Sequence, residues 1–304
     1  MTIFVEDDAR VLAHQSYPGN QFVLRVDAPR IAASAQPGSF VHLRCDPSLL
    51  MRRPLSIMRV CPQQGWVELL YRVVGDGTRL LSQRVVGDSI NVMGPIGQPF
   101  VAQPDRPRAL LIGGGVGIPP MVFLADQLRV AADNYRPFVL MGSETPFPFT
   151  PQPSQFIVPG MPEGVMAAMP LMEDWDIASR LASQHSFAGC FQGYVTELAV
   201  AWLDAMTATE RDEVSVYACG PHPMLAAVAR VADRYHLPCQ VSLEERMACA
   251  VGGCAGCVVP VRSAAGEMSM QRVCVDGPVF DAREVFTDCY GYELGSSCDT
   301  GQVG

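Results

Sequence analysis

The sequence predicts an N-terminal antiparallel β-barrel over residues 1–102, a central parallel-sheet nucleotide-binding α/β domain over 103–237 and a C-terminal cysteine-rich lobe over 238–304. Short apolar runs separated by turns fill the first segment, strand-like runs alternate with helical patterns in the second, and closely spaced cysteines and glycines dominate the third. A chain of 304 residues is long enough for this arrangement, because single domains usually contain about 100 to 150 residues.

The predicted barrel is based on four apolar runs that are bounded by turn residues, a pattern typical of antiparallel strands. These runs are Phe22–Val26, Ser39–Leu43, Trp66–Tyr71 and Ser89–Met93. The Pro-rich stretch 98–107 that follows them is expected to link the barrel to the central domain.

The central domain is predicted from strands that lead into turns and helices. Arg108–Ile112 precedes a Gly-rich turn and a helical pattern, Phe138–Met141 follows, and Val214–Ala218 leads into a second turn and helix. Repetition of strand, loop and helix is typical of a parallel α/β sheet.

Two segments of the predicted barrel have the chemistry of a flavin site. Arg53-Pro54-Leu55-Ser56 offers a guanidinium and a hydroxyl to a diphosphate. The run from Tyr71, Arg72 and Val73 to Gly77 and Thr78 ends a strand in a Gly turn and begins a helix near Arg79, which presents free backbone N–H groups. Each segment alone is more often an ordinary turn, but together they favour FAD.

A nicotinamide-nucleotide site is predicted at the ends of two central strands. The run Gly113 to Pro120, with Gly114, Gly115 and Gly117, opens a helix whose N-terminus attracts anions. It departs from the Rossmann fingerprint because Pro120 replaces the last glycine. Cys219-Gly220-Pro221 repeats the arrangement after the second strand, and a buried core cysteine is the plainer interpretation of Cys219. Glu144, after Phe138–Met141, favours NAD over NADP because it would repel a 2′-phosphate.

Four cysteines give the most specific signal in the chain. Cys249, Cys254 and Cys257 have the spacing C-x4-C-x2-C, and Cys274 follows. This spacing is that of plant-type [2Fe–2S] ligation, and Gly252, Gly253 and Gly256 are expected to supply positive φ and space for the sulfides. Structural zinc is the alternative, although zinc sites usually pair their ligands at both ends.

Composition limits the remaining possibilities. The net charge of -9 argues against nucleic-acid binding, and no apolar stretch is long enough to span a bilayer. Eleven cysteines without an export signal indicate a cytoplasmic protein with metal or redox chemistry.

On these motifs the chain resembles the ferredoxin-NADP reductase superfamily, and more closely the electron-transfer subunits of dihydroorotate dehydrogenase B. The flavin, nicotinamide and cysteine motifs occur in the same order as in that family. The run from Ser242 to Cys249 and the run from Arg272 to Phe280 are similar to the family's cluster lobe. Ala250, where the family usually has Gly, and Leu55, where many relatives of the superfamily have Tyr, depart from the pattern.

The resemblance implies that an FMN-containing catalytic subunit oxidises dihydroorotate, in pyrimidine biosynthesis, in an expected heterotetramer with two copies of each chain. Electrons then pass through [2Fe–2S] and FAD to NAD. The chain itself is expected to carry no catalytic acid or base, because its five His form no cluster with a nucleophile.

Two alternatives stay open at this point. One is the small subunit of an NAD(P)H-ferredoxin transhydrogenase or of a soluble hydrogenase, and the other is a non-catalytic nucleotide- or zinc-binding adaptor. The tail with Cys289 and Cys298 has no assigned role.

Overall fold

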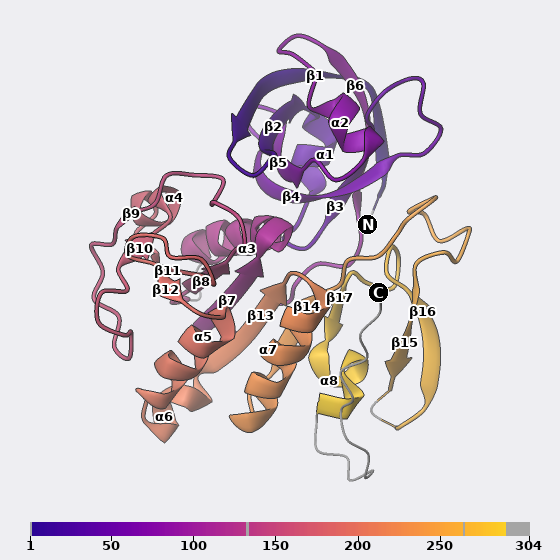
Figure 1. Ribbon diagram of the computed structural model, residues 1–304. Coiled ribbons are helices and arrows are strands. Elements are labelled where there is room, and N and C mark those ends of the chain that lie inside the picture. Colours follow the sequence, from indigo (N-terminus) through magenta and orange to yellow (C-terminus); the bar gives the residue numbers. More distant parts are fainter. Residues whose placement is uncertain (1, 132–133, 264, 290–304) are drawn as a thin grey trace.

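The computed structural model describes residues 2–131, 134–263 and 265–289. It contains a closed antiparallel barrel, a seven-stranded sheet covered by helices, and a small hairpin lobe beside the edge of that sheet (Figure 1). The predicted fold class is confirmed. Cys298 lies outside the described residues.

The barrel is closed by pairing between its first and last strands, in the order β1-β2-β5-β4-β3-β6. Its strands are β1 (Phe4–Tyr17), β2 (Gln21–Asp27), β3 (Phe40–Arg44), β4 (Arg53–Cys61), β5 (Trp66–Arg72) and β6 (Ser89–Ile96). Two short helices, α1 (Pro29–Ser34) and α2 (Asp76–Leu81), occupy connections between strands. Alternate residues such as Val41 and Leu43 fill the barrel core, as the period of a strand requires.

The central sheet has the order β12-β11-β8-β7-β13-β14-β17. Its strands are β7 (Arg108–Gly114), β8 (Phe138–Gly142), β11 (Ala178–Ser183), β12 (Phe191–Gln192), β13 (Val214–Cys219), β14 (Cys239–Ser242) and β17 (Val279–Asp281). All neighbours are parallel except β17, which pairs antiparallel with β14. The last two strands at one side of the sheet, β14 and the edge strand β17, therefore come from the part of the chain assigned by sequence to the cysteine-rich lobe.

Helices cover both faces of this sheet. On one face α3 (Ile118–Val130) and α4 (Pro170–Asp174) pack against side chains such as Leu111 and Val139. On the other face α5 (Val195–Asp204) and α7 (His222–Arg234) pack against side chains such as Leu110 and Leu140. The alternation follows from the two-residue period of strands buried on both faces.

The remaining elements are short. They are β9 (Gln152–Pro153), β10 (Ala167–Ala168), α6 (Ala208–Asp212), the hairpin β15 (Val258–Arg262) with β16 (Met268–Arg272), α8 (Ala282–Val285), and the 3₁₀ turns Gly115–Gly117 and Thr287–Cys289. No helix within the described ranges has the length and apolar character needed to cross a bilayer. The domain boundaries at 102/103 and 237/238 stay predictions.

Candidate cofactor sites

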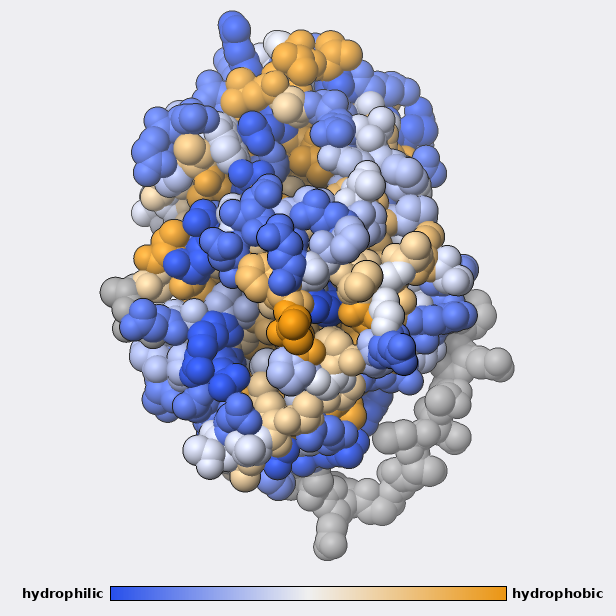
Figure 2. Space-filling model, turned by 90° about the vertical axis from the view of Figure 1, so that its left-hand side faces the viewer, coloured by the Kyte–Doolittle hydropathy of each residue, from blue (hydrophilic) through white to orange (hydrophobic). Residues whose placement is uncertain are grey.

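A cavity of about 820 Å³ lies at the junction of the barrel, the central domain and the lobe. Figure 2 shows a hollow bordered by hydrophobic residues between the barrel and the central domain. Its wall combines three parts of the chain that are distant in sequence: the ends of β4 and β5 with Thr78 of α2, Val116 of the Gly-rich turn, and the segment Ser242–Met247 with Pro278. The volume falls in the range of cofactor sites.

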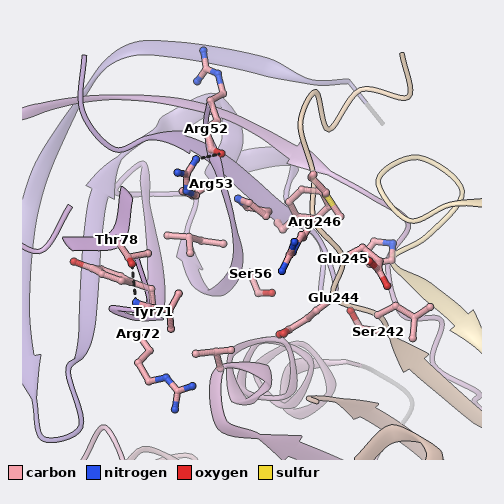
Figure 3. Close-up of a pocket in the computed structure, with 18 of the residues that line it drawn as sticks. Arg52, Arg53, Ser56, Tyr71, Arg72, Thr78, Ser242, Glu244, Glu245 and Arg246 are labelled. Carbon is pink, nitrogen blue, oxygen red and sulfur yellow. Dashed lines mark hydrogen bonds between the residues drawn. The ribbon is translucent and has the colours of Figure 1, made fainter. Parts of the chain in front are cut away.

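Most of the predicted flavin residues line this cavity. They are Arg53, Pro54, Leu55, Ser56, Tyr71, Arg72 and Thr78 (Figure 3). Gly77 does not line the cavity. It lies so close to Arg53 that a side chain at position 77 would overlap the guanidinium. Val73 packs against the barrel core and is not part of the wall. The wall has no aromatic ring at Leu55, as the sequence indicated.

The turn after β5 differs from its predicted form. The helix begins at Asp76 rather than near Arg79, so Gly77 and Thr78 lie in its first turn. The Thr78 hydroxyl accepts hydrogen bonds from the amides of Val74 (3.0 Å) and Gly75 (3.3 Å), and it donates to the Gly75 carbonyl (3.1 Å). Two of the expected free amides are therefore used to hold the turn, and those of Asp76, Gly77 and Thr78 remain as first-turn donors.

Tyr71 is buried, and its hydroxyl is directed away from the cavity. It is 2.8 Å from Nε2 of His14, whose Nδ1 is 2.8 Å from the Arg84 carbonyl oxygen. Burial raises the pKa of the Tyr71 hydroxyl. Tyr71 therefore contributes its ring, and not its hydroxyl, to the cavity wall.

The two predicted nicotinamide motifs lie side by side at the carboxyl ends of β7 and β13. Gly113 pairs with Cys219 across these strands, and any side chain at Gly117 would overlap the Cys219 carbonyl. Pro119 and Pro120 lie in the first turn of α3, as predicted, and both are buried. Gly115 has φ +56 and faces open space, so the tip of the turn is accessible. Ligands of parallel sheets bind in this position.

The cluster loop brings its four cysteines together in two pairs. Cys254 lies close enough to Cys249, and Cys257 close enough to Cys274, to shift the pKa of that neighbour. In the described ranges, no three His, Cys, Asp or Glu side chains are placed to hold a single ion. A [2Fe–2S] cluster instead divides four thiolates between two irons, so two pairs fit it.

Backbone amides of the loop point at the sulfur atoms. Val251 N lies 3.5 Å from Cys249 Sγ, and Gly256 N lies 3.4 Å from Cys254 Sγ. Hydrogen bonds from the loop, that of Val251 first, lower the pKa of Cys249 to about 7, which favours the thiolate that binds metal. Burial raises the pKa of Cys274 to about 11.

The loop glycines were predicted to supply positive φ, and this is wrong for two of the three. Gly252 has φ +81, but Gly253 and Gly256 are outside the left-handed region, and Ala250 (φ 58) and Ala255 (φ 50) adopt it instead. Loop curvature therefore depends on alanines in a conformation that glycine tolerates better.

Glu244 and Arg246 are site residues that sequence reasoning missed, because it assigned their segment to the cluster lobe alone. The Glu244 carboxylate and the Arg246 guanidinium face the part of the cavity that Ser56 lines (Figure 3). Desolvation by the surrounding protein raises the pKa of Glu244. The only available signal was their closeness in sequence to the first cluster cysteine.

Comparison with known proteins decides the family. Residues 244–286 match the iron–sulfur cluster binding domain of dihydroorotate dehydrogenase B. The chain is 36% identical over 282 residues to the dihydroorotate dehydrogenase B (NAD(+)) electron transfer subunit of Desulforamulus reducens, covering 91% of this chain and 97% of that one. It is 38% identical to the Listeria innocua protein of the same name, covering 83% and 88%. The chain belongs to this family of electron transfer subunits.

Solved structures agree on the fold of this family member. The structure of an NADH-dependent reduced ferredoxin-NADP oxidoreductase is similar with a TM-score of 0.73 and 24% identity, covering 91% of this chain and 89% of that one. A ferredoxin reductase of carbazole 1,9a-dioxygenase is similar with a TM-score of 0.59 and 20% identity, covering 78% and 68%. The chain is thus an oxidoreductase electron-transfer subunit on a reductase scaffold.

Proposed function

We propose that this chain passes electrons from an FMN-containing, dihydroorotate-oxidising partner subunit through a [2Fe–2S] cluster and FAD to NAD⁺, in pyrimidine biosynthesis. The observation that carries the proposal is the composition of the cavity wall. The flavin segment, the nicotinamide turn at Val116 and the segment that leads into the cluster loop all line one space. Bound FAD would exchange single electrons with a cluster and a hydride with a nicotinamide.

The residues proposed to hold FAD are those on the barrel side of the cavity. Arg53 and the first-turn amides of α2 suit the diphosphate, because an exposed guanidinium and unpaired N–H groups bind anions. Ser56, at the other end of the segment, suits the ring. The Arg53 guanidinium is already fixed by the carbonyls of Met51 (2.9 Å) and Arg52 (3.1 Å), which lowers the entropy cost of binding.

The Gly-rich turn and the Cys219-Gly220-Pro221 turn are proposed to bind the nicotinamide nucleotide. Their backbones approach closely at Gly117, where a side chain would overlap the Cys219 carbonyl, and the Met224 side chain lies against both Gly114 and Gly220. Glu144 is exposed after β8 and supports NAD over NADP by charge.

Substrate oxidation is assigned to the partner subunit, in a heterotetramer with two copies of each chain. Among the described residues the His side chains are committed elsewhere or isolated: His14 is bound to Tyr71, and His42 is buried. A cytoplasmic location is proposed because ligand thiols must stay reduced until a cluster is assembled.

The test is reconstitution of the purified chain with a dihydroorotate-oxidising subunit, followed by NADH formation from dihydroorotate. Flavin, iron and sulfide are measured on the same anaerobic sample. Cys254→Ser should abolish NADH formation in the complex while FAD content and NADH oxidation by an artificial acceptor persist. Cys190→Ser, outside the cluster loop, is the matched control.

Three results would contradict the proposal. Zinc without iron in the intact protein would remove the cluster, and a colourless protein would support the adaptor alternative. Reduction of ferredoxin, with no response to a dihydroorotate-oxidising subunit, would favour the transhydrogenase alternative.

A further inference from the structure

Arginine side chains supply most of the charge on the cavity wall, and they differ in their hydrogen-bond partners. The four that line the cavity are Arg52, Arg53, Arg72 and Arg246. Arg52 donates to the His42 carbonyl (3.3 Å), and Arg53 donates to the carbonyl of Met51 (2.9 Å). These two guanidinium groups are therefore held by the protein itself.

Arg72 and Arg246 have no such partners. Within the part of the chain that the structure describes, neither guanidinium group makes a hydrogen bond or an ion pair. Glu244 lines the same space as Arg246 without pairing with it. A guanidinium that faces a cavity without a counter-ion is placed to meet an anionic group of whatever occupies the cavity.

The two free guanidinium groups lie in different parts of the cavity. Arg72 is the last residue of β5 and lies across the cavity from Arg246, whose guanidinium points toward Ser56 (Figure 3). Sheet register puts the Arg246 side next to the nicotinamide site, because Gly113, Cys219 and Ser242 pair in a row across β7, β13 and β14. The chain then continues from Ser242 to Arg246.

On the proposed function, the reactive ring of FAD must lie at the Ser56 side, within reach of the nicotinamide. The diphosphate would then lie at the side of Arg53 and the first turn of α2. A hydride from NADH carries two electrons and one proton, so it leaves the flavin ring with one added negative charge. A fixed cation beside the ring stabilises that charge and raises the reduction potential.

We propose that Arg246 sets the reduction potential of the bound flavin by stabilising the negative charge of its reduced ring. This inference rests on the proposed function. Arg72, at the other side of the same cavity, contributes to holding the cofactor.

The experiment compares the midpoint potential and the FAD content of the purified holoprotein in three variants. Arg246→Gln removes the charge and keeps most of the reach, Arg246→Lys keeps the charge, and Arg72→Gln is the matched control. Arg246→Gln should lower the FAD potential by about 30 mV or more, a tenfold change in a two-electron equilibrium. Arg246→Lys should retain most of the wild-type potential, and Arg72→Gln should weaken FAD binding with a smaller shift in potential.

The outcomes are distinguishable. An Arg246→Gln protein that holds FAD at the wild-type potential overturns the inference. Loss of FAD from Arg246→Gln, to the same degree as from Arg72→Gln, also overturns it, because Arg246 would then be a binding residue. A wild-type protein without FAD contradicts the proposed function instead.

Discussion

His42 on β3 is a buried side chain whose ring nitrogens have no hydrogen-bond partner. It is 1% exposed, and in the described structure neither Nδ1 nor Nε2 is paired. Burial, and then the nearby charge of Arg52, lower the pKa of His42 to about 4. The folded protein therefore holds this imidazole neutral at pH values where the unfolded chain protonates it.

A pH-dependent loss of stability follows from His42. Below its ordinary value of about 6.5 the unfolded chain binds a proton that the folded chain accepts only near pH 4. The free energy of unfolding should therefore fall by up to about 3 kcal/mol as the pH decreases through this window. Urea unfolding of wild type and His42→Phe at pH 7 and pH 5 measures the difference, and parallel losses in both proteins would refute the assignment.

Ala255 in the cluster loop has an unfavourable backbone conformation. It is exposed and has φ 50. Ala255→Gly should therefore stabilise the protein by about 0.5 to 1 kcal/mol. This is the energy cost of a left-handed alanine minus the larger conformational entropy that Gly loses on folding. Thermal unfolding of the loaded protein measures the change. Ala250→Gly is the comparison: it has φ 58 but is 1% exposed, so loss of its buried methyl should offset the gain. An equal gain in both variants, or none at Ala255, would contradict this account.

At the scale of elements, the proposed nicotinamide site depends on the close approach of two turns. Gly117 lies against the carbonyl of Cys219, where no Cβ can be accommodated. Gly75, in the turn after β5, has nothing within 4 Å and an extended φ of -172. A substitution to Ala therefore meets a crowded position at Gly117 and an open position at Gly75.

Gly117→Ala should destabilise the central domain by about 1 to 3 kcal/mol, because the added methyl forces the turns apart. It should also raise the KM for NADH, whereas Gly75→Ala should change neither quantity. Thermal unfolding and steady-state NADH oxidation measure the two effects. Unchanged stability and KM in Gly117→Ala would show that the turns do not need this contact.

At the scale of the whole molecule, Arg59 joins the barrel to the central domain. Its guanidinium carbon lies 5.6 Å from the centroid of Trp66 on β5 and 5.7 Å from that of Trp175 after α4. Arg129 of α3 also lies over Trp175, at 4.7 Å, but both belong to the central domain. Arg59 is thus placed to fix the barrel, with its proposed flavin residues, relative to the central domain.

Arg59→Met should slow flavin reduction by NADH, because it removes the Arg59–Trp175 cation–π contact, worth about 1 kcal/mol, from the junction. Arg129→Met should lower stability without slowing that step. Stopped-flow reduction of both variants tests the difference. Equal rates in Arg59→Met and wild type would mean that other contacts alone set the domain arrangement.

The sequence by itself determined the features that depend on local spacing. Cys249, Cys254 and Cys257 belong to one loop, and a spacing read along the chain is enough to predict their convergence. The strands Gln21–Asp27 and Val214–Cys219 were also predictable, because apolar runs between turn residues form strands wherever they can be buried.

Only the tertiary structure decided which distant segments share a site. Glu244 and Arg246 reach the cavity because β14 extends the central sheet and ends beside β13, a pairing that no local pattern encodes. The left-handed φ of Ala250 was equally hidden, since alanine disfavours it in isolation and accepts it only when the surrounding fold compensates. Residue spacing along the chain is enough to predict a ligand loop, whereas the contact between distant segments depends on long-range packing.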